Sequence, residues 1–311
     1  MENVKVYCII VTYNAMKWVD KCLGSLRNSS LKLYPVIIDN CSNDETVRYI
    51  KENYPDAYLI ANSDNRGFGQ ANNQGIEYAY KNGGTHFFLL NQDAWVHTNT
   101  VSRLVEVQDK YGIAIASPIH LNGPGNLLDF NYFSYSVLNT SNIDYVSDLI
   151  LNNLKDYYSV PKINAAAWML TKEIIERVGG FDPIFFHYGE DNNYCQRVIY
   201  NKEIVAFVTG AFIHHDRERK GNVSVFKKNA VTAKLLNEYV DINKNIGSLT
   251  KTRLKMHLSN FKLAVFLLLK LKLSDFAGLF TSYVTFIRKF SKIRYSRKIN
   301  KDRSHNWLKL D

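Results

Sequence analysis

Short apolar runs alternate with longer amphipathic stretches over the first 117 residues. The runs are rich in β-branched residues, which is typical of buried strands, and the stretches between them carry apolar residues at helical spacing. The predicted strands are Val4–Val11, Val36–Asp39, Ala57–Ala61, His86–Leu90 and Ile113–Ser117. The predicted helices are Lys17–Asn28, Asp44–Asn53, Gly69–Lys81 and Thr98–Tyr111. This alternation predicts an α/β fold with a mostly parallel sheet flanked by helices.

The pattern becomes irregular at residues 118–160, which are rich in Asn, Tyr and Ser, with one short helix expected near Val146–Leu154. Beyond it the alternation returns. Strands are expected at Ile163–Leu170 and Ile204–His214, and helices at Lys172–Val178 and Glu190–Tyr200. We therefore expect one α/β catalytic domain over residues 1–220.

Residues 221–311 have a different pattern, in which apolar helical segments alternate with Lys and Arg. Helices are expected at Phe261–Leu273 and Phe276–Phe290, followed by the cationic segment Lys292–Arg303. This region holds 19 of the 39 Lys and Arg but only five of the 29 Asp and Glu, whereas residues 1–220 are slightly acidic. We expect a separate helical, basic C-terminal region.

Such charge asymmetry indicates an anionic partner. Apolar segments beside a cationic cluster favour an anionic membrane surface, and no nucleic-acid recognition pattern accompanies the charge. A second explanation stays open, in which these helices pack on the catalytic domain and the lysines are solvated.

The N-terminus has no secretory pattern and the four cysteines lack CxxC spacing. We expect a cytoplasmic protein, peripheral on the inner face of the plasma membrane if the tail binds lipid.

Polar residues follow the predicted strands, where an α/β sheet binds its ligands. The first strand has no glycine-rich phosphate turn after it, so a dinucleotide or P-loop site is excluded. A nucleotide would instead contact side chains after the strands. The candidates are Thr12, Asn14 and Asp39, with Tyr13 beside them at the end of the first strand.

The fourth strand is followed by Asn91, Gln92 and Asp93. A carboxylate beside carboxamides can hold a hard divalent cation when a diphosphate supplies further oxygens, although Asp93 could equally cap the next turn. His214 and His215 end the last predicted strand and are further candidates for contact with a metal or a diphosphate.

Glu190 and Asp191 open a predicted helix after an aromatic loop. A helix N-terminus favours an ionised carboxylate, whereas an apolar wall disfavours it. One of the two acids is a candidate general base; helix capping is the other explanation. Trp168 is either a sugar-stacking platform or a buried strand residue.

Five segments together resemble the family 2 nucleotide-sugar glycosyltransferases, most closely the bacterial rhamnosyltransferase-like branch. They are VTYN at 11–14, DNCSND at 39–44, NRGFGQANNQG at 65–75, LLNQDA at 89–94 and GGFDPIFFHYGEDNNYCQR at 179–197. The resemblance implies a GT-A fold and an inverting transfer from a nucleoside-diphosphate sugar to an acceptor hydroxyl. It implies Mn²⁺ or Mg²⁺ as cofactor and a glycan or lipid-linked acceptor, in assembly of a bacterial surface polysaccharide or other glycan.

The resemblance also gives roles to single residues. It implies Asp191 as the catalytic base with Glu190 beside it, and Asp93 and His215 as metal contacts, with His214 as the alternative. It also implies that Asp39 reads the nucleotide base and that Asn65, Gly67 and Asn72 lie near the nucleotide. Trp168 and Tyr188 are assigned to the acceptor side. The chain departs from the family pattern at Asn91 and at Asn193, where many relatives have an acid.

An in-line displacement requires the base and the metal on opposite sides of one sugar, so we expect Asp93 and Asp191 to open into one pocket. Two other functions stay open at this point. A sugar-nucleotide nucleotidyltransferase also uses an α/β domain, and a nucleic-acid-binding protein could use the basic tail.

Overall fold

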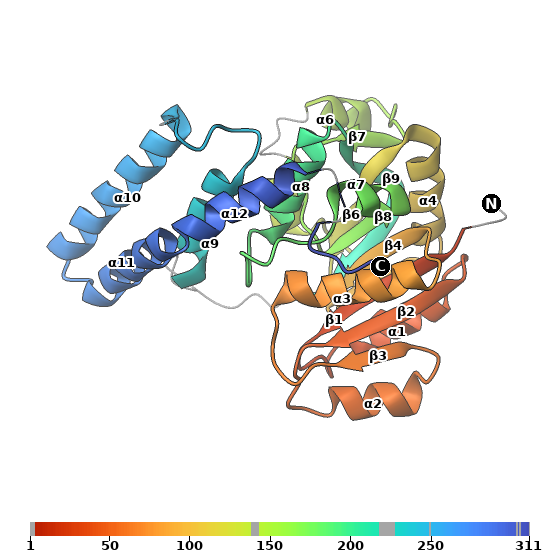
Figure 1. Cartoon of the computed structure of the whole chain (residues 1–311). Coiled ribbons are helices and arrows are strands. Elements are labelled where there is room, and N and C mark those ends of the chain that lie inside the picture. The colour runs from red at the N-terminus through yellow and green to blue at the C-terminus, as the bar shows by residue number, and fades with distance from the viewer. Residues whose placement is uncertain are drawn as a thin grey trace.

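The computed structural model describes residues 4–137, 143–217, 228–248, 250–302, 304 and 306–310. A mixed, nine-stranded sheet forms the centre of this part of the chain (Figure 1), in the order β3-β2-β1-β4-β8-β6-β9-β5, with β7 also paired to β9. The strands are β1 Val6–Thr12, β2 Leu33–Asp39, β3 Tyr58–Ala61, β4 His86–Asn91, β5 Ala94–Val96, β6 Ile113–Asn122, β7 Tyr157–Ser159, β8 Ala167–Thr171 and β9 Ile204–His215. The predicted α/β fold class is confirmed.

The β1–β4 half of the sheet is parallel, as the alternation predicted. The strand β8 interrupts this arrangement, because it lies antiparallel between β4 and β6. The short strands β5 and β7 also pair antiparallel with β9 and were not predicted.

Helices cover both faces of the sheet. They are α1 Val19–Arg27, α2 Thr46–Asn53, α3 Phe68–Lys81, α4 Thr100–Tyr111, α5 Phe130–Tyr132, α6 Ile143–Ile150, α7 Lys172–Val178 and α8 Glu190–Tyr200, with a π-helical turn at Phe133–Val137. Successive residues of a strand point to opposite faces, so β1 divides its side chains between two cores. Cys8 and Ile10 pack with α1 and α4, whereas Tyr7 and Ile9 pack with α3, α7 and α8.

The C-terminal region forms four helices, α9 Lys228–Val240, α10 Lys251–Leu269, α11 Leu273–Arg288 and α12 Phe290–Lys301. Part of it docks on the catalytic domain through a third apolar core, in which Phe185 meets Leu236, Phe286 and Ile293. The predicted boundary at 220/221 lies outside the described residues. The packing explanation for the tail therefore holds for this part of it.

The last described residues return to the main sheet. Leu308 is buried in the core beneath α3 and α7, and the Gly180 amide donates to the carbonyl of Asn306 over 2.8 Å. The carboxamide of Asn73, on α3, donates to the carbonyls of both Phe181 and Trp307. Segments far apart in the sequence are thus held by one side chain.

Candidate functional site

A cavity of about 430 Å³ lies at the carboxyl ends of β1, β2 and β4, where the sequence predicted the donor. We call it the donor cavity. Its lining residues are Val11, Tyr13, Asn40, Asn65, Gly67, Phe68, Asn91, Gln92, Asp93, Phe186 and His187. The structure therefore brings together Tyr13, Asn65, Gly67 and the 91–93 segment. Asn40 also lines this cavity and was missed, although it directly follows the predicted strand that ends at Asp39.

Hydrogen bonds between side chains and backbone fix the loops that form this cavity. The Gln92 carboxamide accepts from the Tyr13 amide over 2.7 Å and donates to the Tyr13 carbonyl over 3.2 Å. Asn40 donates to Asn65 over 2.9 Å, and the same Asn65 oxygen accepts from the Gly67 amide. These contacts hold the binding loops in place without a ligand, which lowers the entropy cost of binding one.

Other predicted donor residues support the cavity from behind. Asp39 is buried, accepts from the Thr12 hydroxyl over 2.9 Å and also accepts from the backbone and hydroxyl of Ser42. Asn14 accepts from the Asn43 amide over 2.8 Å. Thr12, Asn14 and Asp39 do not line the donor cavity, so their direct contact with a nucleotide stays a prediction.

Asn72 lies elsewhere. It is 1% exposed on α3, and its carboxamide donates to the Phe68 carbonyl one helical turn earlier. Asn72 does not line the donor cavity, so its place near the nucleotide stays a prediction.

The histidines that end β9 point to opposite faces of the sheet, as adjacent strand residues must. His215 is buried, with Nε2 3.4 Å from Asp93 Oδ1 and Nδ1 3.3 Å from Asp129 Oδ2. His214 instead stacks on Trp95 and meets His97, with 3.0 Å between their Nε2 atoms. The alternative assignment of His214 is therefore wrong, and His215 is the histidine beside Asp93.

Asp129 was missed because it lies in the irregular 118–160 segment. Burial raises the pKa of Asp129, but hydrogen bonds from His215 and from the Tyr132 amide, with the nearby Arg217 charge, bring it to about 2. Burial lowers the pKa of His215, but the carboxylates of Asp129 and Asp93 raise it by more. The net result is a His215 pKa above its usual range. Asp129 therefore stays ionised and orients the imidazole toward Asp93.

The side chains around Asp93 fit a hard divalent cation. Asp93 is 22% exposed and lines the cavity. The oxygen Oδ1 of Asn91 is buried with no hydrogen-bond partner in the described part of the chain. This oxygen is therefore free to act as a metal ligand. No group of three or more His, Cys, Asp or Glu side chains with metal-site geometry occurs among the described residues. A cation here would need further ligands, and a diphosphate can supply them.

A second cavity, of about 580 Å³, is bordered by Tyr188 and Gly189, which directly follow Phe186 and His187 of the donor cavity. We call it the second cavity. It is lined by Tyr135, Lys162, Asn164, Tyr188, Gly189, Asp191, Asn192, Gln196, Ala233, Lys234, Asn237 and Glu238. Asp191 and Tyr188 therefore share this cavity, and neither lines the donor cavity. Lys162 and Tyr135 were missed; the Lys162 ammonium lies 4.0 Å from the centre of the Tyr135 ring.

Asp93 and Asp191 thus open into separate cavities, and the expectation of one shared pocket is not met. The segment between the cavities is the aromatic loop: Phe186 and His187 face the donor side, and Tyr188 faces the other side. Phe185 anchors this loop in the third core, while Phe186 and Tyr188 are about half exposed.

The two acids that open α8 differ in their surroundings. Burial raises the pKa of Asp191, although that carboxylate accepts from the Asn192 amide over 2.7 Å and faces the charges of Arg217 and Lys162. Burial, together with the charge of Asp191, raises the pKa of Glu190 to about 8. Glu190 Oε2 has no partner among the described residues. Glu190 and Asp191 therefore titrate as a pair, and burial together with their mutual repulsion favours retention of a proton by that pair.

Trp168 does not line either cavity. Its ring is 0% exposed in the middle of β8 and packs between Phe181 and Tyr194. The insertion of β8 between β4 and β6 buries this ring, so the assignment of Trp168 as an acceptor platform is wrong.

The comparison with protein families fits this geometry. The sequence model described as Glycosyl transferase family 2 matches residues 7–179, more than half of the chain, and the matched part includes most of the donor-cavity lining. The chain belongs to glycosyltransferase family 2. This membership favours the glycosyltransferase hypothesis over the nucleotidyltransferase and nucleic-acid-binding alternatives.

Among curated proteins, this family 2 chain is 23% identical over 198 residues to the dTDP-rhamnosyl transferase RfbF of Shigella flexneri. That match covers 63% of this chain and 64% of RfbF. The chain is also 26% identical over 165 residues to the low-salt glycan biosynthesis hexosyltransferase Agl10 of Haloferax volcanii, covering 52% of each. The chain thus spans less than two thirds of the length of these relatives.

Solved structures share the fold. S. aureus TarS 1–349 in complex with UDP-GlcNAc aligns with a TM-score of 0.59 and 16% identity, over 96% of this chain and 86% of that one. GalNAc-T7 with UDP, GalNAc and Mn²⁺ aligns with a TM-score of 0.56 and 15% identity, over 82% of this chain and 54% of that one. The predicted GT-A type of fold is confirmed.

Proposed function

We propose that this chain transfers a sugar from a nucleoside-diphosphate sugar to an acceptor hydroxyl, with inversion at the anomeric carbon. One observation carries the proposal: a preorganised cavity with Asp93 and a cavity with Asp191 are both bordered by one short loop, the first at Phe186 and His187 and the second at Tyr188 and Gly189. An in-line displacement needs a leaving-group site and a base on opposite sides of the sugar.

The donor cavity would hold the nucleoside diphosphate. The exposed ring of Tyr13 suits a base, and the carboxamides of Asn40 and Asn65 suit polar groups of a ribose. Asp93 and His215, with Asn91 Oδ1, would hold Mn²⁺ or Mg²⁺. When bound, that ion supplies neutralising charge for the diphosphate as the sugar leaves.

Asp191 would take the proton of the acceptor hydroxyl as its oxygen forms the new bond to the anomeric carbon. Burial raises the pKa of Asp191, which suits a group that must accept a proton. The Asn192 amide and the charges of Arg217 and Lys162 oppose that rise and favour the ionised carboxylate. A base in this role contributes about 10²–10⁴-fold to the rate.

The aromatic loop must then admit the sugar between the two carboxylates. Phe186 and His187 would move aside when the donor binds, because they line the donor cavity and directly precede Tyr188, which lines the cavity of Asp191. Tyr188 would border the acceptor. The acceptor is proposed to be a glycan or a lipid-linked sugar in glycan assembly, and the similarity to RfbF favours dTDP-rhamnose for the first donor trials.

A thermal-shift screen of nucleoside diphosphates and nucleotide sugars, with and without Mn²⁺, tests the donor assignment. A selective ligand raises the melting temperature by mass action, and we expect that rise to be larger with Mn²⁺. Release of nucleoside diphosphate from the selected donor, and NMR of the anomeric configuration of the product, test transfer and inversion. Selective binding without any release, or a retained configuration, would contradict the proposal.

A further inference from the structure

The helices α10 and α11 form a hairpin that projects from the body of the molecule (Figure 1). The base of the hairpin is fixed by Arg253, whose buried guanidinium donates to the carbonyls of Asn245, Ile246 and Ser248. Beyond this anchor, α10 packs mainly against α11. The far end of the hairpin therefore reaches solvent while its near end is held firmly.

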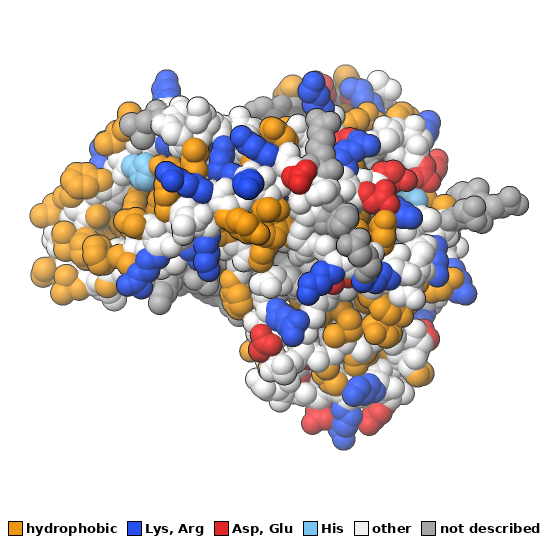
Figure 2. All heavy atoms as spheres, viewed as in Figure 1, with side chains coloured by type: hydrophobic (Ala, Val, Ile, Leu, Met, Phe, Trp, Pro, Cys, Tyr) orange, Lys and Arg blue, Asp and Glu red, His pale blue; other side chains and the backbone are white. Residues whose placement is uncertain are grey.

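Large apolar side chains gather at the far end. Leu269, Leu271 and Leu273, around the turn between the helices, are 78%, 80% and 61% exposed, and Phe261 and Phe280 are exposed to a similar extent. Figure 2 shows this concentration of hydrophobic side chains at the end of the hairpin. Single exposed apolar residues are ordinary, but a contiguous apolar patch marks an interaction surface.

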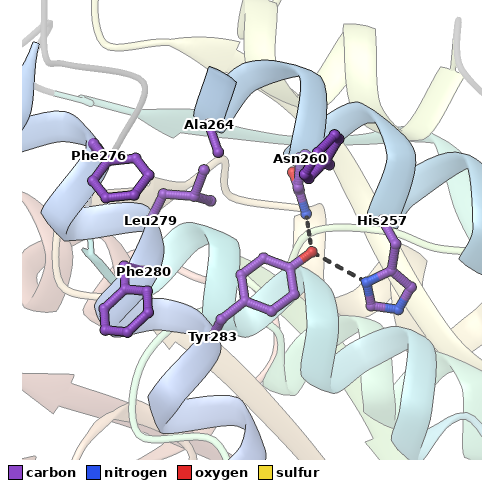
Figure 3. Close-up of a pocket in the computed structure, with 8 residues that line it drawn as sticks. His257, Asn260, Ala264, Phe276, Leu279, Phe280 and Tyr283 are labelled. Atoms are coloured by element: carbon purple, nitrogen blue, oxygen red, sulfur yellow. Dashed lines mark hydrogen bonds between the residues drawn. The ribbon is translucent and has the colours of Figure 1, made fainter. Parts of the chain in front are cut away.

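A groove between the two helices continues this surface inward (Figure 3). It has a volume of about 360 Å³, and its walls are mostly apolar, with Phe261 and Ala264 on α10 and Phe276 and Leu279 on α11. Its main polar group, the Tyr283 hydroxyl, accepts from Asn260 over 3.1 Å and pairs with His257 over 3.1 Å. Because these polar atoms satisfy one another, the groove suits an apolar occupant.

The charge around this patch is almost entirely positive. Residues 251–301 hold thirteen Lys and Arg and a single acid, Asp275. Lys262, Lys270 and Lys272 lie exposed at the far end and form no ion pair within the described ranges. A second copy of the chain would bring the same positive charge to the contact, whereas an anionic leaflet offers opposite charge and an apolar interior.

We propose that the α10–α11 hairpin is an interfacial anchor for an anionic lipid bilayer. Its leucine tip enters the boundary between headgroups and acyl chains, an acyl chain enters the groove, and the three lysines contact lipid phosphates. No helix in the described residues is both long enough and apolar enough to span a bilayer. The proposed mode of binding is that of an amphipathic segment lying in the plane of the interface.

Sedimentation of the full chain with lipid vesicles tests this proposal without any assay of transfer. We expect binding to vesicles that mix phosphatidylcholine with phosphatidylglycerol, weaker binding to phosphatidylcholine alone, and a loss of binding as salt rises. Equal binding to both kinds of vesicle, or to neither, would overturn the proposal.

Three variants separate the apolar and the charged contributions. The triple change Leu269→Ser, Leu271→Ser and Leu273→Ser should abolish binding to both vesicles. The double change Lys270→Gln and Lys272→Gln should weaken binding to anionic vesicles about fivefold for each lysine, with little effect on phosphatidylcholine. The matched control is Ile150→Ser with Leu151→Ser, two residues at the end of α6 that are 77% and 73% exposed; it should bind like the wild type.

A second measurement guards against a variant that fails to fold. Tryptophan in the single variant Phe280→Trp should be quenched by brominated lipid in anionic vesicles, beyond the quenching of the wild-type chain. Unchanged quenching would overturn the proposal. Self-association through the leucine tip, seen by light scattering without vesicle binding, would overturn it in favour of a second copy of the chain.

Discussion

The two cavities beside the aromatic loop are built in different ways. The donor cavity is formed by loops after consecutive strands, and carboxamide side chains hold those loops through local hydrogen bonds. The second cavity takes its residues from the irregular segment, the start of α8 and the C-terminal helix α9, and its acids are buried against one another. The difference suggests that binding and proton transfer are supported separately, so that substitutions should affect one and spare the other.

The sharpest test of this separation is Asp191→Asn. We expect the rate of transfer to fall by about 10²–10⁴-fold, because the carboxamide cannot accept the acceptor's proton. Donor-induced stabilisation should persist, since Asp191 does not line the donor cavity. Turnover with the selected donor and thermal shift with the nucleoside diphosphate would be measured together. Asp144→Asn, on the exposed start of α6, is the control; near-normal turnover by Asp191→Asn would refute the base assignment.

Asp129→Asn should have the opposite effect, because it should weaken the binding of metal and donor and leave the base Asp191 in place. The carboxamide keeps an acceptor for the Tyr132 amide but loses the charge that orients His215. Removal of such a supporting carboxylate costs about 10–100-fold in metal affinity. Titration of Mn²⁺ against the donor-induced thermal shift would measure this loss. An unchanged Mn²⁺ requirement would show that His215 does not act through Asp129.

The loop between the cavities can be disturbed from the donor side through Gly67→Ala. Gly67 has φ +79°, and a Cβ there would lie 2.1 Å from the backbone oxygen of Phe186, so the loop must shift. We expect a loss of about 1–3 kcal/mol of unfolding free energy and altered donor affinity. Gly83→Ala has a similar φ of +77° but open space around it, and it measures the backbone strain alone. Equal effects of the two variants would show that contact with the loop does not matter.

The last effect is expected from Glu190→Gln, and it depends on pH. The raised pKa of about 8 means that the folded chain holds the proton more tightly than the unfolded chain does. The stabilisation from this proton is complete below the ordinary pKa of Glu and is lost as pH rises through about 8. The variant should lack that decline. The difference in melting temperature, variant minus wild type, should therefore be more positive at alkaline pH than at acidic pH. Parallel pH profiles of melting temperature would argue against a buried neutral Glu190.

The sequence could predict the donor cavity better than the second cavity for a physical reason. Strand periodicity places Asn65, Asn91 and Asp93 at one edge of a parallel sheet, so local pattern and topology agree. Trp168 shows the limit of prediction from local pattern. Its strand lies antiparallel between two others, and no local pattern distinguishes a buried ring on a strand from an exposed one. Asp129 and Lys162 belong to segments without periodicity, and only the folded chain brings them to His215 and Asp191.

The docking of the C-terminal segment has a consequence for biosynthesis. Asn73 holds the carbonyls of Phe181 and Trp307 at once, and Leu308 completes a core that begins with β1. While residues near 308 are still inside the ribosomal tunnel, the segment that leads into the aromatic loop lacks this clamp. A nascent chain should therefore complete the aromatic loop, and with it both cavities, only after those residues have emerged.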